Sequence, residues 1–201
     1  MPLSGWHNYY VILIGKMQFV LASASPRRKE LLSYILTSFD IVPSQAEEEV
    51  NLSLFPEQMA CSLAERKCDA VFKANRQKTV IGCDTIVVYN GEILGKPKDR
   101  DEAVQTLKKL SGKTHFVITG VCVQNKFKKV LNFEQTEVKF NILTDEFIES
   151  YVSGGSPMDK AGSYGIQDEG VVKEYFGSYT NVMGLPVTLT KKMIEEVLKD
   201  L

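Results

Sequence analysis

The stretch TVIGCDTIVVYNGEIL, residues 79–94, decides the fold class of this chain. The residues before Asn90 are mostly apolar or β-branched, which favours a buried strand. Asn90-Gly91 then gives the strongest short signal for a tight β-hairpin turn. Because the two arms of a hairpin run antiparallel, a sheet that contains this stretch is at least partly antiparallel.

Strand and helix patterns alternate on both sides of this hairpin. We expect further strands over residues 18–22, 39–43, 116–124 and 136–141, and helices over residues 27–36, 56–75, 99–110, 144–152 and 187–198. The sequence shows no internal repeat and no linker. This pattern predicts a mixed α/β fold rather than a regular doubly wound sheet, with lobes that meet at a cleft.

Composition narrows the class of protein. The chain has 201 residues, of which 44% are hydrophobic, enough for one sizeable core or two small lobes. Its net charge of -1 provides no global field for nucleic acid or an anionic membrane, so we expect neither partner. Cys61, Cys68, Cys83 and Cys122 form no CxxC pair, which favours reduced thiols in a cytoplasmic protein over a zinc site.

The first residues are set apart from the rest. Residues 9–14 form one apolar run that is too short to span a bilayer and has no basic segment before it. We therefore treat residues 1–16 as an N-terminal extension of unclear role and expect residues 17–201 to form a single domain.

The stretch LASASPRRKELL, residues 21–32, contains a helix start with unusual charges. Ser25 fits an N-cap and Pro26 fits the first helical position, but Arg27, Arg28 and Lys29 fill a turn that normally favours acidic residues. Either these cations are solvated and tolerate a penalty of roughly 0.3–1 kcal/mol each, or they bind a phosphate at the helix start. In the second case, removing Arg27 or Arg28 would leave the free protein equally stable or slightly more stable.

Asp84 is the charged residue that interrupts the apolar strand of the hairpin. Burying a carboxylate is costly unless it binds a metal or is hydrogen-bonded. The local sequence leaves two interpretations open, a structural aspartate that caps the end of the strand and a catalytic or metal-binding carboxylate.

Several long blocks in one order resemble the signatures of the Maf family of nucleoside triphosphate pyrophosphatases. They are LASASPRRKELL, GCDTIVVYNGEILGKPKD, LKKLSGKTHFVITGV, GSPMDKAGSYGIQ and NVMGLP, and they extend from about residue 18 to the C-terminus. The resemblance implies a fold like that of inosine triphosphate pyrophosphatases, an elongated mixed sheet flanked by helices, with two lobes around a cleft. It also implies that residues 17–201 cleave a nucleoside triphosphate to the monophosphate and pyrophosphate with a divalent metal, Mg²⁺ or Mn²⁺, with Co²⁺ a further candidate and a homodimer one candidate assembly.

The resemblance also implies roles for individual residues. Asp84 is implied as general base or metal ligand, with Glu48, and Glu47 beside it, as partners around the metal. The residues implied to bind the triphosphate or select the base are Ser23, Arg27, Arg28, Lys67, Thr85, Lys96, Asp159 and Gln167. Among these, Arg27, Thr85 and Gln167 form the specificity set, and only one of Lys67 and its neighbour Arg66 can face the cleft.

The Asp-Thr pair at residues 84–85 is similar to the dTTP/UTP pyrophosphatase branch, which removes non-standard nucleotides from the pool. Two alternatives are a 7-methyl-GTP-type pyrophosphatase, which usually has Asp-Gln there, and a nucleotide-binding regulator of cell division without turnover. The sequence departs from the family pattern at Cys83, where Ala is usual, and at Asp168, where Gly is usual. We expect Asp168 to add negative charge near the base pocket.

Overall fold

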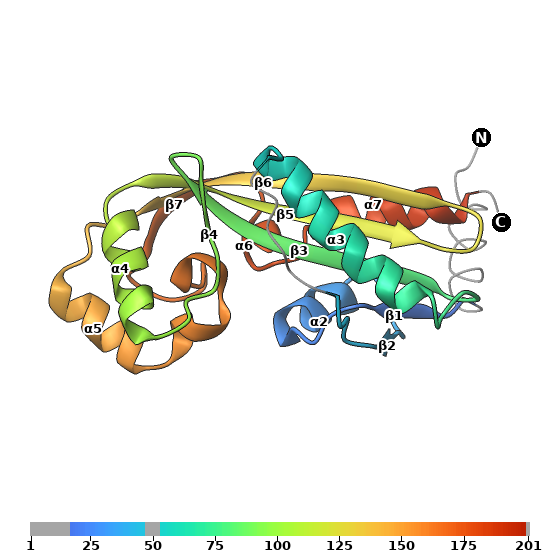
Figure 1. Cartoon of the computed structure of the whole chain (residues 1–201), viewed down its shortest axis with the longest axis horizontal. Helices are drawn as coiled ribbons and strands as arrows, with labels where there is room; N and C mark the ends of the chain where they lie inside the picture. The colour runs from blue at the N-terminus through green and yellow to red at the C-terminus, as the bar shows by residue number, and fades with distance from the viewer. Residues whose placement is uncertain (1–16, 47–52, 200–201) are drawn as a thin grey trace, which may run out of the picture.

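The computed structural model describes residues 17–46 and 53–199, and these build an elongated mixed α/β structure (Figure 1). Within them, seven strands form one sheet in the order β2-β1-β3-β5-β6-β7, with β4 paired to β3 beside this path. The strands are β1 (Phe19–Leu21), β2 (Asp40–Ile41), β3 (Thr79–Tyr89), β4 (Glu92–Leu94), β5 (Thr114–Gln124), β6 (Lys129–Phe140) and β7 (Val172–Phe176). The helices are α2 (Pro26–Ser33), α3 (Pro56–Phe72), α4 (Arg100–Leu110), α5 (Asp145–Ser153), α6 (Tyr179–Val182) and α7 (Val187–Leu198), with short 3₁₀ turns η1 (Ser156–Asp159) and η2 (Ala161–Ser163).

The hairpin predicted from residues 79–94 is present and sets the character of the sheet. Strands β3 and β4 pair antiparallel, and the turn between them places Asn90 and Gly91 at positive φ, 49° and 79°. Strand β3 also pairs antiparallel with β5, whereas β1 runs parallel to it. The predicted mixed sheet is therefore confirmed, and β3 is the strand where its parallel and antiparallel parts meet.

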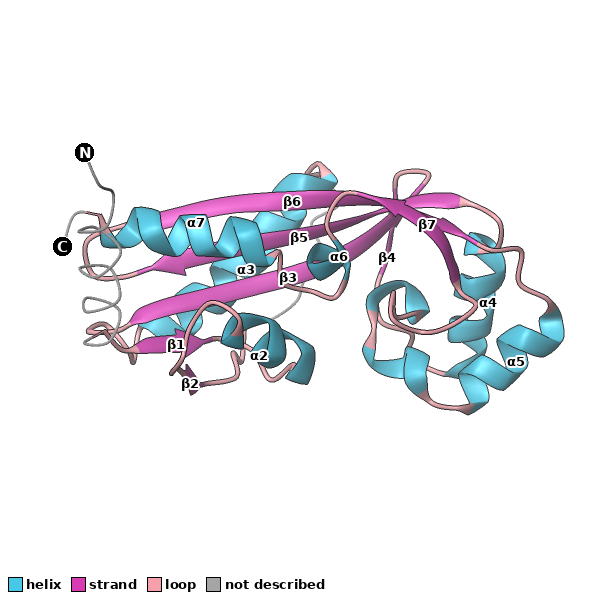
Figure 2. Ribbon diagram, turned by 180° about the vertical axis from the view of Figure 1, so that it is seen from behind, coloured by secondary structure: helices cyan, strands magenta, loops and turns pink. Residues whose placement is uncertain are grey.

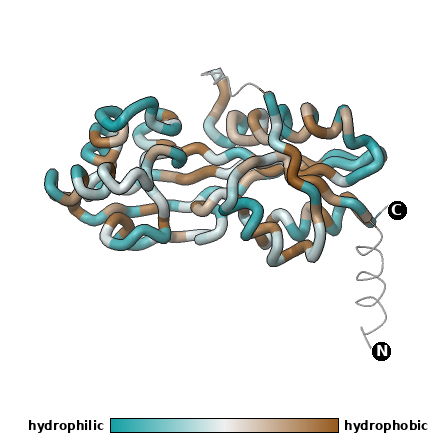
Figure 3. Tube along the Cα trace, turned by 90° about the horizontal axis from the view of Figure 1, so that it is seen from below, coloured by the Kyte–Doolittle hydropathy of each residue, from teal (hydrophilic) through white to brown (hydrophobic). Residues whose placement is uncertain are grey.

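Helices cover both faces of the sheet, and at one end of it they form a second lobe. Helix α3 lies across one face, and α2, α6 and α7 lie on the other, as the view from behind shows (Figure 2). At the far end of β3, β5 and β6, the helices α4 and α5 form a second lobe with its own buried cluster. Apolar residues concentrate along the strands through the middle of the molecule (Figure 3).

Several element boundaries differ from the sequence expectation. Strand β6 begins at Lys129 rather than residue 136, because its first half is exposed or half-buried and so lacks a buried apolar pattern. Strand β7 and helix α6 were not predicted, since they lie in the Gly- and Ser-rich segment and all five β7 residues are exposed or half-buried. The helix expected over residues 27–36 ends at Ser33, and the strand expected over residues 39–43 has only two residues.

Helix α3 approaches the sheet very closely. A Cβ atom at Gly120 of β5 would lie 2.2 Å from the Ala60 carbonyl oxygen, and one at Gly82 of β3 would lie 2.6 Å from the Ala64 carbonyl oxygen. Because glycine has no Cβ atom, the helix backbone can contact these two neighbouring strands directly.

In the described part of the chain, no helix combines the length and the hydropathy that crossing a membrane requires.

This close approach can be tested by adding one methyl group. We expect Gly120→Ala to lower the free energy of unfolding by at least about 2 kcal/mol, because the obstacle is helix backbone that cannot rotate away. The control is Gly95→Ala, where a Cβ atom meets nothing within 4 Å and the effect should stay within about 0.5 kcal/mol. Urea denaturation of both variants measures the difference, and equal stabilities would show that α3 does not rest on β5 in this way.

Candidate functional site

A cavity of about 520 Å³ lies between the two lobes. Its wall on one side is formed by the start of α2 and the middle of β3, and on the other by the loop after β4 and the segment that carries η1 and η2. Of the predicted site residues, those that line it are Ser23, Arg27, Arg28, Lys67, Asp84, Thr85, Lys96, Asp159 and Gln167. Glu47 and Glu48 lie outside the described residues.

The start of α2 forms one wall of the cavity through its capping residues. As predicted, Ser25 is the N-cap, and its Oγ accepts a hydrogen bond from the Arg28 backbone N–H at 3.4 Å. Ser23 lies two residues earlier, and its Oγ accepts from the Ser25 N–H at 3.2 Å. The sequence therefore folds into a tight serine-rich turn that directs the following arginines toward the cavity.

The Arg28 guanidinium is held by neutral acceptors from three separate segments. Its Nε donates to the Gly184 carbonyl at 2.9 Å, its Nη2 to Thr85 Oγ1 at 3.1 Å, and its Nη1 to Ser23 Oγ at 3.4 Å. These bonds are made without any ligand, so the structure favours a loss of stability on removing Arg28 over the expected equal or higher stability of the free protein. No carboxylate neutralises this cation in the hydrogen bonds that the described residues make with it.

Arg27 reaches the opposite lobe instead. Its Nη1 lies 3.0 Å from Asp159 Oδ2 in a partly exposed ion pair, and Lys160 Nζ lies 2.9 Å from the other Asp159 oxygen. Burial alone would raise the pKa of Asp159, but the hydrogen bonds from Lys160 and Arg27 outweigh it and lower that pKa. The Arg27–Asp159 pair is thus a bridge across the cavity, whereas Lys29 is exposed and does not line it.

Asp84 and Lys67 form a buried ion pair in the cavity wall. Lys67 Nζ contacts Asp84 Oδ1, and each side chain is only 12% exposed. Asp84 faces Gly120 in the middle of the β3–β5 ladder, so the alternative that it caps a strand end is wrong. Helix α3 supplies Lys67 to the cavity, whereas Arg66 does not line it, as expected for two adjacent helical residues.

A chain of buried hydroxyl and amide groups extends from Thr85 to α6. Thr85 Oγ1 lies 2.9 Å from Thr119 Oγ1, which donates to the Asn181 carbonyl at 3.0 Å. Asn181 Nδ2 in turn donates to the Val117 carbonyl at 3.0 Å and to Thr136 Oγ1 at 2.9 Å. Sequence reasoning missed Thr119 and Asn181 as supports of the site, although polar residues inside an apolar strand and in the NVMGLP block were a usable signal.

The far wall carries the remaining predicted residues. Lys96 is exposed in the loop after β4, and the preceding Gly95 carbonyl accepts from the Gly162 N–H at 3.0 Å, which ties this loop to η2. Gln167 is exposed at the edge of the cavity. Asp168 does not itself line the cavity, because its carboxylate turns toward Tyr151 and the N–H of Gly165, a residue that does line it. The effect of its charge on the base pocket stays a prediction.

The donor chemistry of the cavity fits a hard divalent cation. Among the described residues, Asp84 and Asp159 are the carboxylates that line it, and no cluster of three or more His, Cys, Asp or Glu side chains occurs in that part of the chain. Mg²⁺ commonly binds through one or two carboxylates together with phosphate oxygens of the substrate. This set therefore suits a metal whose coordination is completed by a phosphate-bearing ligand rather than a cage made by the protein alone.

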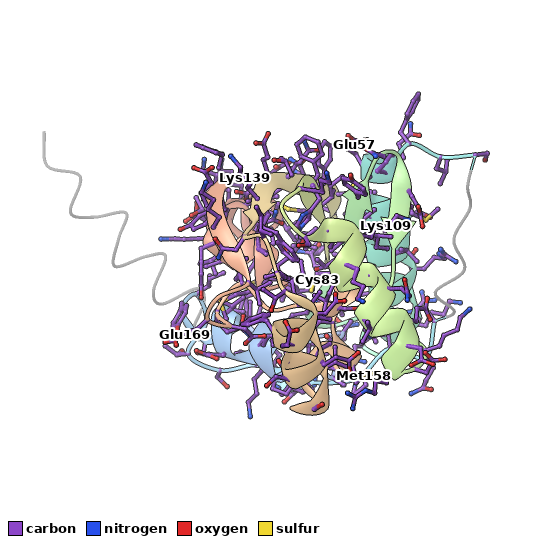
Figure 4. The ribbon with its side chains drawn as sticks, turned by 90° about the vertical axis from the view of Figure 1, so that its left-hand side faces the viewer. Glu57, Cys83, Lys109, Lys139, Met158 and Glu169 are labelled. Atoms are coloured by element: carbon purple, nitrogen blue, oxygen red, sulfur yellow. The ribbon has the colours of Figure 1, made fainter. Side chains whose placement is uncertain are left out.

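Cys83, beside Asp84, departs from the family pattern but does not disturb the site. Its side chain is fully buried near the centre of the molecule (Figure 4), and burial raises the pKa of its thiol. A buried thiol with a raised pKa is unreactive, so Cys83 acts as a small apolar residue in the core.

Comparisons with known proteins agree on one family. The family model described as Maf-like protein matches residues 18–197. The dTTP/UTP pyrophosphatase of Bacillus pumilus (strain SAFR-032) is 48% identical over 180 residues, which cover 89% of this chain and 95% of that protein. The dTTP/UTP pyrophosphatase of Aquifex aeolicus (strain VF5) is 45% identical over 183 residues, with coverage of 90% and 96%.

One solved structure supports the fold. The Staphylococcus aureus Ham1 protein superposes with a TM-score of 0.54 over 89% of this chain and 98% of its own. Its sequence is only 14% identical, so this likeness concerns the fold alone.

The two arginines of α2 should differ in their effect on the stability of the free protein. We expect Arg28→Ala to lower the free energy of unfolding by about 1–3 kcal/mol, because the Gly184 carbonyl and two hydroxyls lose a charged donor. Arg27→Ala is the control, since its exposed ion pair contributes at most about 1 kcal/mol. Urea denaturation without nucleotide measures both, and an Arg28→Ala protein as stable as the wild type would contradict the hydrogen-bond assignment.

His115 links the stability of the second lobe to pH. Its Nε2 lies 2.8 Å from the hydroxyl of Tyr164, which lines the cavity, and burial lowers the pKa of His115 from 6.5 to about 4. Between these two values the unfolded chain binds a proton that the folded protein does not, so stability falls as the pH is lowered through this window.

We expect the His115 contribution to cost about 2 kcal/mol of folding free energy at pH 5 relative to pH 7.5. Urea denaturation at both pH values should show this loss in the wild type and a smaller one in His115→Gln, which lacks a titrating ring but keeps an amide for Tyr164. Identical pH dependence in both proteins would exclude His115 as the cause.

Proposed function

The chain belongs to the Maf family, and from that membership we propose that it is a nucleoside triphosphate pyrophosphatase that hydrolyses dTTP and UTP. The products are the monophosphate and pyrophosphate, and modified pyrimidine triphosphates are further substrates. The observation that carries this proposal is the buried Lys67–Asp84 pair, which faces a cavity beside the cationic start of α2. The names of the two curated relatives support the same substrates.

The charges that line the cavity favour a polyanion. Its described lining carries five cations, Arg27, Arg28, Lys67, Lys96 and Lys160, against the carboxylates of Asp84 and Asp159. Arg28 is positioned by neutral acceptors, so its full charge remains for a phosphate near the N–H groups that open α2. Lys96 lies on the opposite wall and can contact another part of the same triphosphate.

Asp84 is the residue that we propose acts at the α-phosphorus. Its carboxylate orients a water molecule for attack, while Lys67 balances the buried negative charge and fixes the position of the carboxylate. Arg28 and Lys96 stabilise the charge that develops on the leaving pyrophosphate. A divalent metal, which we propose is Mg²⁺ or Mn²⁺ held by Asp84 and Glu48 with phosphate oxygens, supplies further neutralisation of the triphosphate when bound.

We propose that Gln167 recognises the base. Its amide offers both a donor and an acceptor, which match the edge of uracil or thymine. Thr85 supports the site indirectly. Its hydroxyl is hydrogen-bonded to both Arg28 and Thr119, and so links the specificity set to the phosphate side of the cavity.

We also propose a cytoplasmic location for the protein and a single catalytic domain. The four cysteines are free, three of them buried, which suits a reducing compartment such as the cytoplasm. We place the activity in residues 17–201 as one catalytic domain, and a homodimer stays a prediction.

The test is pyrophosphate release from a panel of triphosphates by the wild type and by Asp84→Asn, with Mg²⁺, with Mn²⁺ and with excess EDTA. We expect dTTP and UTP to be hydrolysed fastest, EDTA to abolish turnover, and Asp84→Asn to lose at least about a hundredfold in rate. Asp40→Asn is the matched control, because Asp40 pairs with Lys78 outside the cavity, and it should keep activity within about twofold.

Each possible result of this assay tests one alternative to the proposed activity or one part of its mechanism. A preference for 7-methyl-GTP would assign the chain to that branch, and nucleotide binding without pyrophosphate release would support a regulator. Wild-type rates for a folded Asp84→Asn protein would remove Asp84 from the chemistry, and full activity in excess EDTA would exclude the metal.

A further inference from the structure

One carboxylate oxygen outside the cavity collects three hydrogen bonds. Asp168 Oδ2 accepts from the Tyr151 hydroxyl, from Ser156 Oγ at 2.9 Å and from the Gly165 backbone N–H at 3.2 Å. The donors come from α5, from η1 and from the segment after η2. A single side-chain atom is therefore hydrogen-bonded to three separate segments of the second lobe.

The same residue closes the turn that carries Gln167. The Asp168 backbone N–H donates to the Gly165 carbonyl at 3.1 Å, while the Asp168 carboxylate accepts from the Gly165 N–H. The turn formed by residues 165–168 is thus held by two hydrogen bonds between its first and last residues, and Gln167 is its third residue. A Cβ atom at residue 165 would lie 2.5 Å from Gln167 Nε2, so the amide of Gln167 packs against the bare glycine backbone.

A second branch of the same cluster reaches Lys160. Lys160 Nζ contacts the Ser156 carbonyl and lies 3.2 Å from Ser156 Oγ, the atom that donates to Asp168. Lys160 and Gln167 both line the cavity, whereas Asp168 does not. Asp168 is therefore connected to two cavity residues while remaining outside the space that a ligand would fill.

We propose that Asp168 is a positioning residue for base selectivity, which acts by fixing the turn that presents Gln167. This inference rests on the proposed function, because it names what decides the choice of base in the same site. The mechanism is preorganisation: a turn held by two hydrogen bonds keeps the amide at one orientation, so a base with the wrong edge meets a donor or acceptor that cannot rotate away. Burial and the bond to Asp168 also raise the pKa of the Tyr151 hydroxyl, which therefore remains a donor.

The experiment compares UTP with CTP, which share the sugar and phosphates and differ at the base edge that an amide reads. In Asp168→Ala we expect the ratio of kcat/KM for UTP over CTP to fall by about tenfold, mainly through a higher KM for UTP. Asp168→Asn should keep the ratio within about threefold of the wild type, because all three donors converge on one oxygen that the asparagine carbonyl can replace. Glu169→Ala, which removes a neighbouring exposed carboxylate, should leave the ratio unchanged (Figure 4).

Hydrogen exchange at the Gly165 amide reports on the turn without any substrate. We expect faster exchange in Asp168→Ala and slow exchange in the wild type and in Asp168→Asn. Should Asp168→Ala fail to fold, Tyr151→Phe removes one donor, together with an acceptor for the Gly165 N–H at 3.2 Å, and should lower the ratio in the same direction.

An unchanged UTP to CTP ratio in a folded Asp168→Ala protein with fast Gly165 exchange would overturn the proposal, because the turn would then be structural only. An Asp168→Asn protein as impaired as Asp168→Ala would overturn it as well, since charge rather than the hydrogen-bond acceptor would be the cause. If the wild type releases pyrophosphate from no triphosphate, the proposed function fails first and this inference with it.

Discussion

The contact between α3 and the sheet is the constraint on which the site depends. Gly82 and Gly120 leave no side chain between the helix and two adjacent strands, so the helix backbone sits at the distance of a direct contact. At that distance Lys67 reaches Asp84 in the middle of β3, and two charges that would each be costly to bury neutralise one another. A helix held further out would leave the carboxylate inside the protein without its cation. The glycines that determine packing therefore also make a buried carboxylate possible at this position.

The unusual cations at the start of α2 have three different environments. Lys29 is exposed away from the cavity, so for it the interpretation as a solvated side chain holds. Arg27 pairs with Asp159 of the other lobe, and Arg28 is held by a carbonyl and two hydroxyls. The repulsion that a helix N-terminus exerts on a cation is thus offset for both arginines by contacts distant in sequence. This is the kind of compensation that a local pattern cannot reveal.

The sequence predicted what depends on local patterns and failed where tertiary contacts decide. The Asn90-Gly91 turn, the Ser25 N-cap and most helices follow from short-range signals, and the structure confirms them. Strand β7 and helix α6 gave no such signal, because neither forms a long apolar pattern. Strand β7 is fixed by pairing with β6, and α6 by hydrogen bonds from Asn181 to β5 and β6. Thr119 and Asn181 stood out as polar residues in their segments, but the role of a buried hydroxyl or amide becomes clear only when its partners are known. For Asp168 the sequence indicated a charge near the base pocket but not its role as an acceptor for three donors, which depends on residues distant in the fold.

The distribution of charge in the cavity follows from these contacts. Asp84 is balanced by Lys67, and Asp159 by Arg27 and Lys160, so both carboxylates of the described lining are paired. Arg28 has only neutral acceptors in its hydrogen bonds, and no ion pair to Lys96 occurs among the described residues. Of the cations that line the cavity, the two without a carboxylate partner among the described residues thus come from opposite walls, one from the lobe of α2 and one from the loop after β4. A ligand that contacts both walls at once can balance the two cations with negative charge spread along its length, and a triphosphate has that property.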